Sequence, residues 1–382
     1  MNGDLVYLDH AATTPVRREA REAMLPFLEG RWGNPSSTHR WGRDARAALE
    51  DARARLAAVL GASPAELFFT RAGTEADNLA VLGRARPFPG AGVAVAATEH
   101  KAVLAAAKAA HAEGAPLRIL PVDGEGVVSL DALDEALAER PAVLSVMWAN
   151  NEVGTLQPVG EIAARCAAAG VAFHSDAVQA LGKVPVRVDE VPVDLLAFSA
   201  HKLGGPKGIG ALYLRRGTKV APLLHGGGQE RGLRPGTEDV AGAAAFAAAA
   251  EAAESERAAT MARVAALRDR LEAELVARVP GLVVNGAGAA RLPTIANLSV
   301  PGADPEALLA SLDLEGIAAS SGSACSSGAV EPSHVLTAMG IPPDLAGPSV
   351  RFSLGWTTTE AEIDRVLDVF PMIVERLRAL AS

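Results

Sequence analysis

Lys202 is the residue in this sequence that most strongly suggests covalent chemistry. It lies in the polar and glycine-rich segment Ser199 to Gly208, directly after the short apolar run Val193 to Phe198. A lysine at the end of a buried strand can form a Schiff base when burial or neighbouring groups lower the pKa of its amine. The alternative is a lysine that binds phosphate or lies at the surface.

Three further apolar runs end on polar side chains in the same way: residues 92–97 before His100, residues 142–148 before Asn151, and residues 171–173 before Asp176. Each run is short and rich in Val, Leu or Ala, which is typical of strands buried on both faces of a parallel sheet. In open α/β sheets the ligand lies outside the carboxyl ends of the strands. Any one of these residues alone would more often be an ordinary strand-end polar group, but together they predict one crevice.

Asp176 favours a pyridoxal phosphate site over a simple phosphate-binding lysine. It follows a separate apolar run and precedes Lys202 by 26 positions. A buried acid that faces the lysine across a planar ring keeps the pyridine nitrogen protonated, so that the ring can withdraw electrons from a substrate carbanion. The alternative is an aspartate that only caps a helix ahead of Ala177 to Gln179.

The turn Thr70 to Asn78 is a candidate site for the phosphate of such a cofactor. It follows a strand-like run and opens a predicted helix, so Gly73 and Thr74 offer backbone N–H groups and a hydroxyl at the helix N-terminus. Anions bind favourably there, although an ordinary helix cap is the alternative. Ser199 and His201, which flank the lysine segment, could supply further donors.

Two other side chains suit the substrate rather than the cofactor. Cys325 lies in the Ser- and Gly-rich segment Ala319 to Gly328, where a thiol is expected to be accessible for nucleophilic attack; an incidental surface cysteine is the alternative. Arg351 has a planar guanidinium that suits the carboxylate of an amino acid. Cys166, in an alanine-rich segment, is interpreted as a small core residue.

The composition favours a cytoplasmic enzyme over a nucleic-acid-binding or membrane protein. The 382 residues are 49% hydrophobic and 21% charged with a net charge of −9, whereas a surface that binds phosphate backbones would be basic. Two cysteines form no disulfide framework and fit a reducing compartment. No secretory leader is expected at the start. The longest apolar stretch, Val240 to Ala250, is too short to span a bilayer. No metal ligands are predicted.

Apolar runs alternate with helical stretches from residue 61 to about Leu214, which predicts an α/β fold with a parallel sheet and crossover helices. Helices are also expected near 17–29 and at 41–60, 241–278, 305–312 and 360–380, and strands at 66–69, 294–300 and 349–354. We predict a large cofactor-binding domain over residues 16–258. A smaller α+β domain is predicted over residues 1–15 and 259–382, and it carries the Cys325 loop.

Ordered motifs over nearly the whole chain resemble the cysteine desulfurase family, the NifS/IscS-like branch of the class V aminotransferases. They are Tyr7–Pro15, Gly33–His39, Gly73–Glu75, Thr98–Lys101, Asn150–Gly154, Asp176–Gln179, Ser199–Lys202, Gly236–Thr237 and Ser321–Cys325. The resemblance implies a fold-type I pyridoxal-phosphate transferase, with a large domain built on a mainly parallel sheet of the seven-stranded type between helices. His10 is a departure, since the family often has Asn or Tyr there.

The resemblance also implies a role for each site residue. Lys202 carries pyridoxal 5′-phosphate, Asp176 pairs with its ring nitrogen, and His100 stacks on the ring and moves protons. The other implied contacts are with the ring hydroxyl (Gln179 and Asn151), the phosphate (Gly73, Thr74, Ser199, His201 and, from the partner subunit of a homodimer, Thr237) and the substrate (Arg351 and Asn151). Cys325 takes the sulfur of L-cysteine as a persulfide and leaves L-alanine.

The implied sulfur acceptor is another protein, for example an iron-sulfur scaffold or a component of a thiolation pathway. The alternatives on the same scaffold are a selenocysteine lyase and a class V aminotransferase, which would not need Cys325. A non-catalytic scaffold that only docks acceptor proteins is disfavoured because Lys202, Asp176, His100 and Cys325 are all present.

Overall fold

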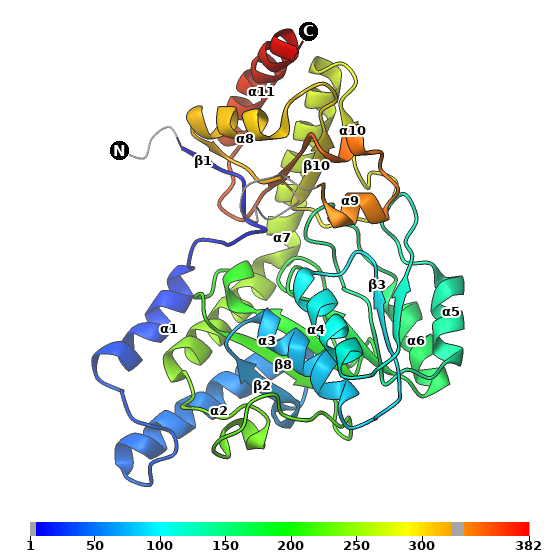
Figure 1. Ribbon diagram of the computed structural model, residues 1–382. Coiled ribbons are helices and arrows are strands. Elements are labelled where there is room, and N and C mark those ends of the chain that lie inside the picture. The colour runs from blue at the N-terminus through cyan, green and yellow to red at the C-terminus, as the bar shows by residue number, and fades with distance from the viewer. Residues whose placement is uncertain (1–4, 322–331, 382) are drawn as a thin grey trace.

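A seven-stranded sheet forms the centre of the larger part of the molecule (Figure 1). The computed structural model describes residues 5–321 and 332–381. The strands lie in the order β2 (Leu67–Thr70), β8 (Gly210–Leu214), β7 (Leu195–Ser199), β6 (Ala172–Asp176), β5 (Val143–Ser145), β3 (Val93–Ala96) and β4 (Leu117–Leu120). Strands β7, β6, β5, β3 and β4 pair in parallel, as the sequence predicts.

Strand β8 differs from the parallel arrangement expected up to Leu214, because it runs antiparallel to both β7 and β2. The chain between β7 and β8, residues 200–209, contains only the short 3₁₀ turn η3 (Ala200–Lys202). A parallel return needs a crossover of a dozen or more residues, usually with a helix. The short connection therefore brings β8 back alongside β7 and keeps Lys202 at the sheet edge.

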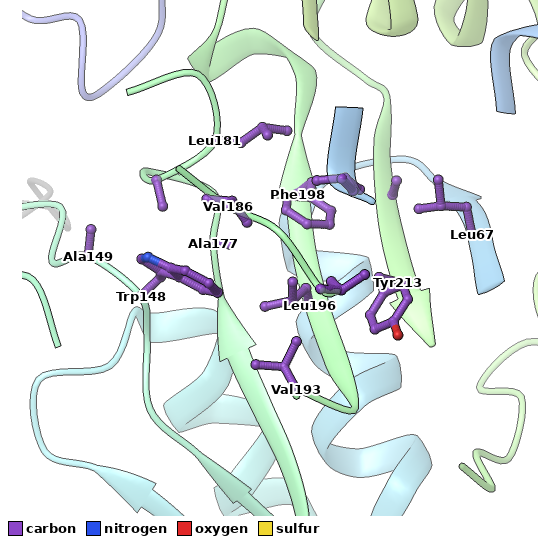
Figure 2. Packing of buried hydrophobic residues seen from close by; sticks show 14 of the residues in the cluster. Leu67, Trp148, Ala149, Ala177, Leu181, Val186, Val193, Leu196, Phe198 and Tyr213 are labelled. Carbon is purple, nitrogen blue, oxygen red and sulfur yellow. The ribbon is translucent and has the colours of Figure 1, made fainter. Parts of the chain in front are cut away.

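Helices cover both faces of this sheet, and the side chains of each strand alternate between the two layers. In β7, Leu196 and Phe198 join the largest hydrophobic cluster, whereas Leu195 and Ala197 join a separate cluster with α3 (Gly73–Asn78) on the opposite face. Figure 2 shows Leu196 and Phe198 in the first cluster, with Tyr213 of β8 opposite Leu196 in the strand register. Burial on both faces explains why these strands are continuous apolar runs.

The helices of the larger part are α1 (Arg18–Glu29), α2 (Arg40–Leu60), α3 with the π-helical turn η2 (Leu79–Gly83), α4 (Lys101–Ala112), α5 (Leu130–Ala138), α6 (Val159–Ala169) and the first half of α7 (Val240–Arg278), with 3₁₀ turns η1 (Pro64–Glu66) and η4 (Gln229–Gly232). The predicted bounds of α1, α2 and α7 are confirmed to within a residue or so. Helix α2 ends at Gly61, whose φ of 67° is left-handed and suits glycine.

A second hydrophobic cluster lies in the smaller part of the molecule, at the top of Figure 1. The elements of this smaller part are β1 (Val6–Tyr7), β9 (Val283–Val284), β10 (Ile295–Ser299), α8 (Pro305–Leu314), β11 (Ile317–Ala318), α9 (His334–Ala338), α10 (Pro343–Ala346), β12 (Ser349–Ser353) and α11 (Glu360–Ala381). Strands β10 and β12 pair antiparallel, and β1 of the N-terminal arm pairs with β11. The strands and helices predicted here are confirmed.

Helix α7 contributes to both clusters. Its first half is buried nearly all round by alanines, whereas its second half buries one stripe, Val264, Leu267, Leu271 and Leu275, in the second cluster. That spacing is typical of a helix with one apolar face. The division into residues 16–258 and residues 1–15 with 259–382 stays a prediction. Within the described ranges, no helix combines the length and apolarity needed to cross a bilayer.

Candidate active site

A cavity of about 250 Å³ lies at the carboxyl ends of the central strands. Most of the residues that the sequence analysis selected line it, together with a few that it did not. The lining residues are Ala11, Ala72, Gly73, Thr74, Asp77, His100, Met147, Ala149, Asn151, Asp176, Val178, Gln179, Ser199, His201 and Lys202. The crevice predicted from the strand ends is therefore present, since parallel strands bring their carboxyl ends to one edge.

The amine of Lys202 lies between the sheet and the N-terminal arm. Its Nζ donates hydrogen bonds to the backbone oxygens of Ala11 and Ala12, at 2.6 and 2.8 Å. Burial, and then the positive charge of Arg351, lower the pKa of the Lys202 amine to about 8. A substantial fraction of the amine is consequently neutral near physiological pH, which is the form that acts as a nucleophile.

Asp176 is the last residue of β6 and is buried at the base of the cavity. Its Oδ1 accepts a hydrogen bond from the backbone N–H of Val178 at 2.9 Å. Residues 178–183 form a turn and not the helix that the capping alternative requires, and Asp176 lines the cavity. Burial raises the pKa of the Asp176 carboxyl, and nearby His100 and Lys202 oppose that shift. A carboxylate beside these two bases can hold or share a proton with a ligand in the cavity.

Asp77 is a cavity residue that the sequence analysis missed. Single ligand atoms of Asp77, His100 and Asp176 all lie within 4.8 Å of one another. Burial, followed by the charges of Asp176 and Glu99, raises the pKa of the Asp77 carboxyl well above its usual range. Two buried carboxylates this close do not ionise together easily, so the charge of Asp176 adds to burial in favouring the protonated form of Asp77. Its position four residues after Gly73, one helical turn away, is the signal that could have identified it.

Hydrogen-bond donors gather at the start of α3. Gly73 allows the close approach of the turn after β6, because a Cβ at this position would lie 2.6 Å from Cγ2 of Val178. Thr74, Ser199 and His201 line the cavity around it. Burial and the charge of Lys202 lower the pKa of His201 to about 4, so its ring is neutral and can donate one hydrogen bond.

His100 caps the N-terminus of α4. Its Nδ1 accepts a hydrogen bond from the backbone N–H of Ala102 at 3.2 Å, so the neutral ring carries its proton on Nε2. Burial lowers the pKa of His100. The imidazole is therefore a neutral group in the cavity wall that can give or take a proton.

Arg351, on β12, reaches the edge of the site from the smaller part of the molecule. Its guanidinium donates hydrogen bonds to the backbone oxygen of Asn151 and to Oδ1 of Asp9, each at 2.8 Å. The buried Nε of Arg351 has no hydrogen-bond partner within the described part of the chain. The guanidinium is thus held in place on one side and keeps N–H groups for an anionic ligand. Asp9 was not predicted, because it meets Arg351 from the opposite end of the sequence.

Of the predicted residues that the structure describes, Arg351 and Thr237 do not line the cavity. Thr237 is exposed on the segment before α7 and does not line it. Cys325 lies outside the described residues. Cys166 is buried on α6, and burial raises the pKa of its thiol to about 12, which confirms its interpretation as a core residue.

Comparisons with known proteins agree on one family. The family model described as aminotransferase class-V matches residues 6–366. A cysteine desulfurase IscS from Dictyoglomus turgidum is 46% identical over 378 residues, which cover 98% of this chain and 96% of the relative. A cysteine desulfurase IscS from Methanosarcina thermophila is 44% identical over 378 residues, 98% of this chain and 93% of the relative.

Solved structures show the same likeness. A NifS-like protein superposes with a TM-score of 0.92 at 37% identity and covers 98% of this chain and 100% of its own. A structure titled SspA in complex with cysteine has a TM-score of 0.79 at 32% identity, with 91% and 98% covered. The latter protein binds cysteine, as its title states.

Proposed function

The chain belongs to the class-V aminotransferase family, in which it is a cysteine desulfurase, and on that premise we propose that it works with pyridoxal 5′-phosphate held at Lys202. The observation that supports this proposal most is the cavity that brings Lys202, Asp176 and the start of α3 together. An amine, an acid and a group of N–H donors are the three kinds of partner that the aldehyde, ring nitrogen and phosphate of this cofactor require.

The cavity residues fit the cofactor by their chemistry. Lys202 would hold it covalently, Asp176 would keep a proton on the ring nitrogen, and Gln179 with Asn151 would face the ring hydroxyl. The phosphate would bind to Gly73, Thr74, Ser199 and His201. When bound, the cofactor supplies a ring that withdraws electrons from the substrate α-carbon.

The protein's own groups then bind the substrate and move protons. We propose that the free N–H groups of Arg351 bind the carboxylate of L-cysteine, because Asp9 and the Asn151 backbone already orient the guanidinium. Lys202, with a pKa of about 8, can accept and return a proton near neutral pH. The neutral imidazole of His100 can do the same through Nε2.

Cys325 is the residue that we propose to take the sulfur. Its thiolate would attack the substrate sulfur, the carbon–sulfur bond would break, and protonation of the remaining carbon would release L-alanine. The persulfide on Cys325 would then pass to an acceptor protein, such as an iron-sulfur scaffold or a thiolation partner. A cytoplasmic location stays a prediction.

A homodimer is part of the proposal. Thr237 is exposed rather than directed into the cavity of its own subunit, which supports a role at the site of a partner. An apolar groove of about 410 Å³ lies next to Thr74 and is lined by Leu223, Leu224 and Leu233. Burial of the exposed Leu224 and the partly exposed Leu223 against a second copy would stabilise the dimer through the hydrophobic effect.

Mass spectrometry after incubation with L-cysteine tests the proposal. We expect one extra sulfur atom on Cys325, with alanine released and a visible absorbance band from the bound cofactor. Lys202→Ala should abolish turnover, and borohydride reduction followed by peptide mapping should find the cofactor on Lys202 in the parent protein. A reduced adduct at another residue, or at none, would refute the assignment of Lys202.

A further inference from the structure

Lys183 is a second buried lysine beside the active site, and neither the sequence motifs nor the reaction account for it. It lies in the turn after β6, where Leu181 and Val184 donate backbone hydrogen bonds to Ala177 and Ala180, each four residues earlier. Only 9% of its surface is exposed. Gly182 is required here, because its φ is 76° and a Cβ would lie 2.9 Å from Cβ of Ala253 on α7. Close packing of this turn against α7 therefore fixes the position of Lys183.

The charged groups that act on Lys183 are cationic. Burial, and then the charges of Lys202 and Arg351, lower the pKa of the Lys183 amine to about 7. A cavity of about 20 Å³, room for about one water molecule, lies between Lys183, Lys202 and His10. Burying an amine among like charges is costly, and such groups concentrate at functional sites.

The contact that Lys183 makes is with Gln179, which is itself a lining residue of the active-site cavity. Nζ of Lys183 donates a hydrogen bond to Oε1 of Gln179 at 2.6 Å. On the other side, Nε2 of Gln179 donates to the backbone oxygen of Ala11 at 2.9 Å. Because the two residues are four apart in a turn with helix-like hydrogen bonds, their side chains lie on the same side.

These two contacts define which way the Gln179 amide faces. If the amide were turned over, Oε1 would face the oxygen of Ala11 and that contact would be lost, while the NH₂ group could bond to the Lys183 amine only in its neutral form. With the amide as it is, the second N–H of Nε2 remains for the cavity. The backbone oxygen of Ala11 also accepts a hydrogen bond from Lys202. The Gln179 amide and the lysine proposed to hold the cofactor therefore share one acceptor.

We propose that Lys183 is a positioning residue that holds the Gln179 amide so that an N–H donor, and not an oxygen, faces the bound cofactor. The inference rests on the proposed function. Its consequence is that the ring oxygen opposite Gln179 would accept a hydrogen bond, which is stronger when that oxygen is ionised. Lys183 thus favours the ionised ring oxygen without touching the cofactor.

A double-mutant cycle between Lys183 and Gln179 tests this inference. The variants are Lys183→Met, Gln179→Leu and the double variant, and the quantities are the dissociation constant for pyridoxal phosphate and the pH midpoint of the visible absorbance. We expect Lys183→Met alone to weaken cofactor binding about tenfold, the effect of one hydrogen bond to a charged group, and to raise the pH midpoint. In the Gln179→Leu background the same change should alter the dissociation constant by less than about twofold.

The controls separate positioning from charge and from folding. Lys108→Met, which removes an exposed lysine on α4, should leave both quantities unchanged, and Lys183→Arg should restore part of the affinity because it keeps a donor. An equal effect of Lys183→Met in both backgrounds, or no effect in either, would overturn the inference.

A second variant covers the case in which Lys183→Met does not fold. Gln179→Glu keeps an acceptor opposite Lys183 but turns an oxygen to the cavity, so it should weaken cofactor binding, and unchanged binding would also overturn the inference. Parent protein that never gains the visible absorbance would instead refute the proposed function.

Discussion

Replacement of Glu99 by Gln should make the protein more stable at neutral and alkaline pH. Glu99 is fully buried after β3, its Oε1 accepts a hydrogen bond from the backbone N–H of Met147 at 2.5 Å, and its Oε2 lies 3.4 Å from Oγ of Ser145. Burial, and then the charge of Asp176, raise the pKa of the Glu99 carboxyl from 4.5 to about 8. Gln has the shape of the protonated acid and keeps both contacts.

The size of the effect follows from proton linkage. Between pH 4.5 and about 8 the folded state holds a proton that the unfolded state has released, so the free energy of unfolding falls as pH rises. At about 1.4 kcal/mol per pH unit, this loss has an upper limit of about 5 kcal/mol at pH 8. Relaxation and water penetration reduce such penalties, and we expect a difference on the order of 2 kcal/mol.

Thermal unfolding of the cofactor-free protein at pH 4, 6 and 8 measures this difference. The midpoints of Glu99→Gln and the parent should agree at pH 4, where both states hold the proton, and diverge in favour of Glu99→Gln up to pH 8. The exposed Glu29→Gln, at the end of α1, is the matched control and should follow the parent. If the parent instead gained stability relative to Glu99→Gln as pH rises, Glu99 would be ionised in the folded state and the reasoning would fail.

Three further outcomes are expected from single substitutions. Gly355→Ala places a Cβ 2.2 Å from Nδ1 of His10 and should destabilise the protein by about 1–3 kcal/mol, seen as a lower unfolding midpoint; an unchanged midpoint would show that His10 moves aside freely. Arg351→Lys removes the bidentate hydrogen bonding to a carboxylate and should raise KM for cysteine about tenfold or more. KM for cysteamine, which lacks the carboxylate, should be unaffected. Equal changes in KM for both compounds would exclude the proposed contact. Cys325→Ser should keep the cofactor absorbance and lose sulfur transfer, and transfer at the parent rate would disprove the role of the thiol.

The core of the site was predictable because parallel strands impose a simple geometric rule. Apolar runs that end on His100, Asn151, Asp176 and Lys202 had to bring these residues to one sheet edge, and the cavity contains all of them. The direction of β8 could have been inferred as well, since the chain after Lys202 is too short for a crossover helix.

The missed residues have environments that only the packed chain creates. In the sequence, Asp77 has no feature that distinguishes it from an ordinary helical residue. Only in the folded chain do a carboxylate oxygen of Asp77 and one of Asp176 lie within 4.8 Å of each other. The sequence suggests a surface lysine at position 183, yet only 9% of Lys183 is exposed, in a turn whose Gly182 packs against α7. Burial and neighbouring charge are what change the pKa of such groups, and neither is visible in residue type or spacing.

The sequence by itself determined the alternation of buried strands and helices, the residues that end those strands, and the family to which the chain belongs. These follow from local periodicity and from motifs that are contiguous in the chain. Only the tertiary structure decided that Arg351 is held by Asp9, 342 positions away, and that Gln179 is held between Lys183 and the backbone oxygen of Ala11. Such contacts join segments that are distant in sequence, so their geometry exists only once the arm, the sheet and the smaller part of the molecule have packed together.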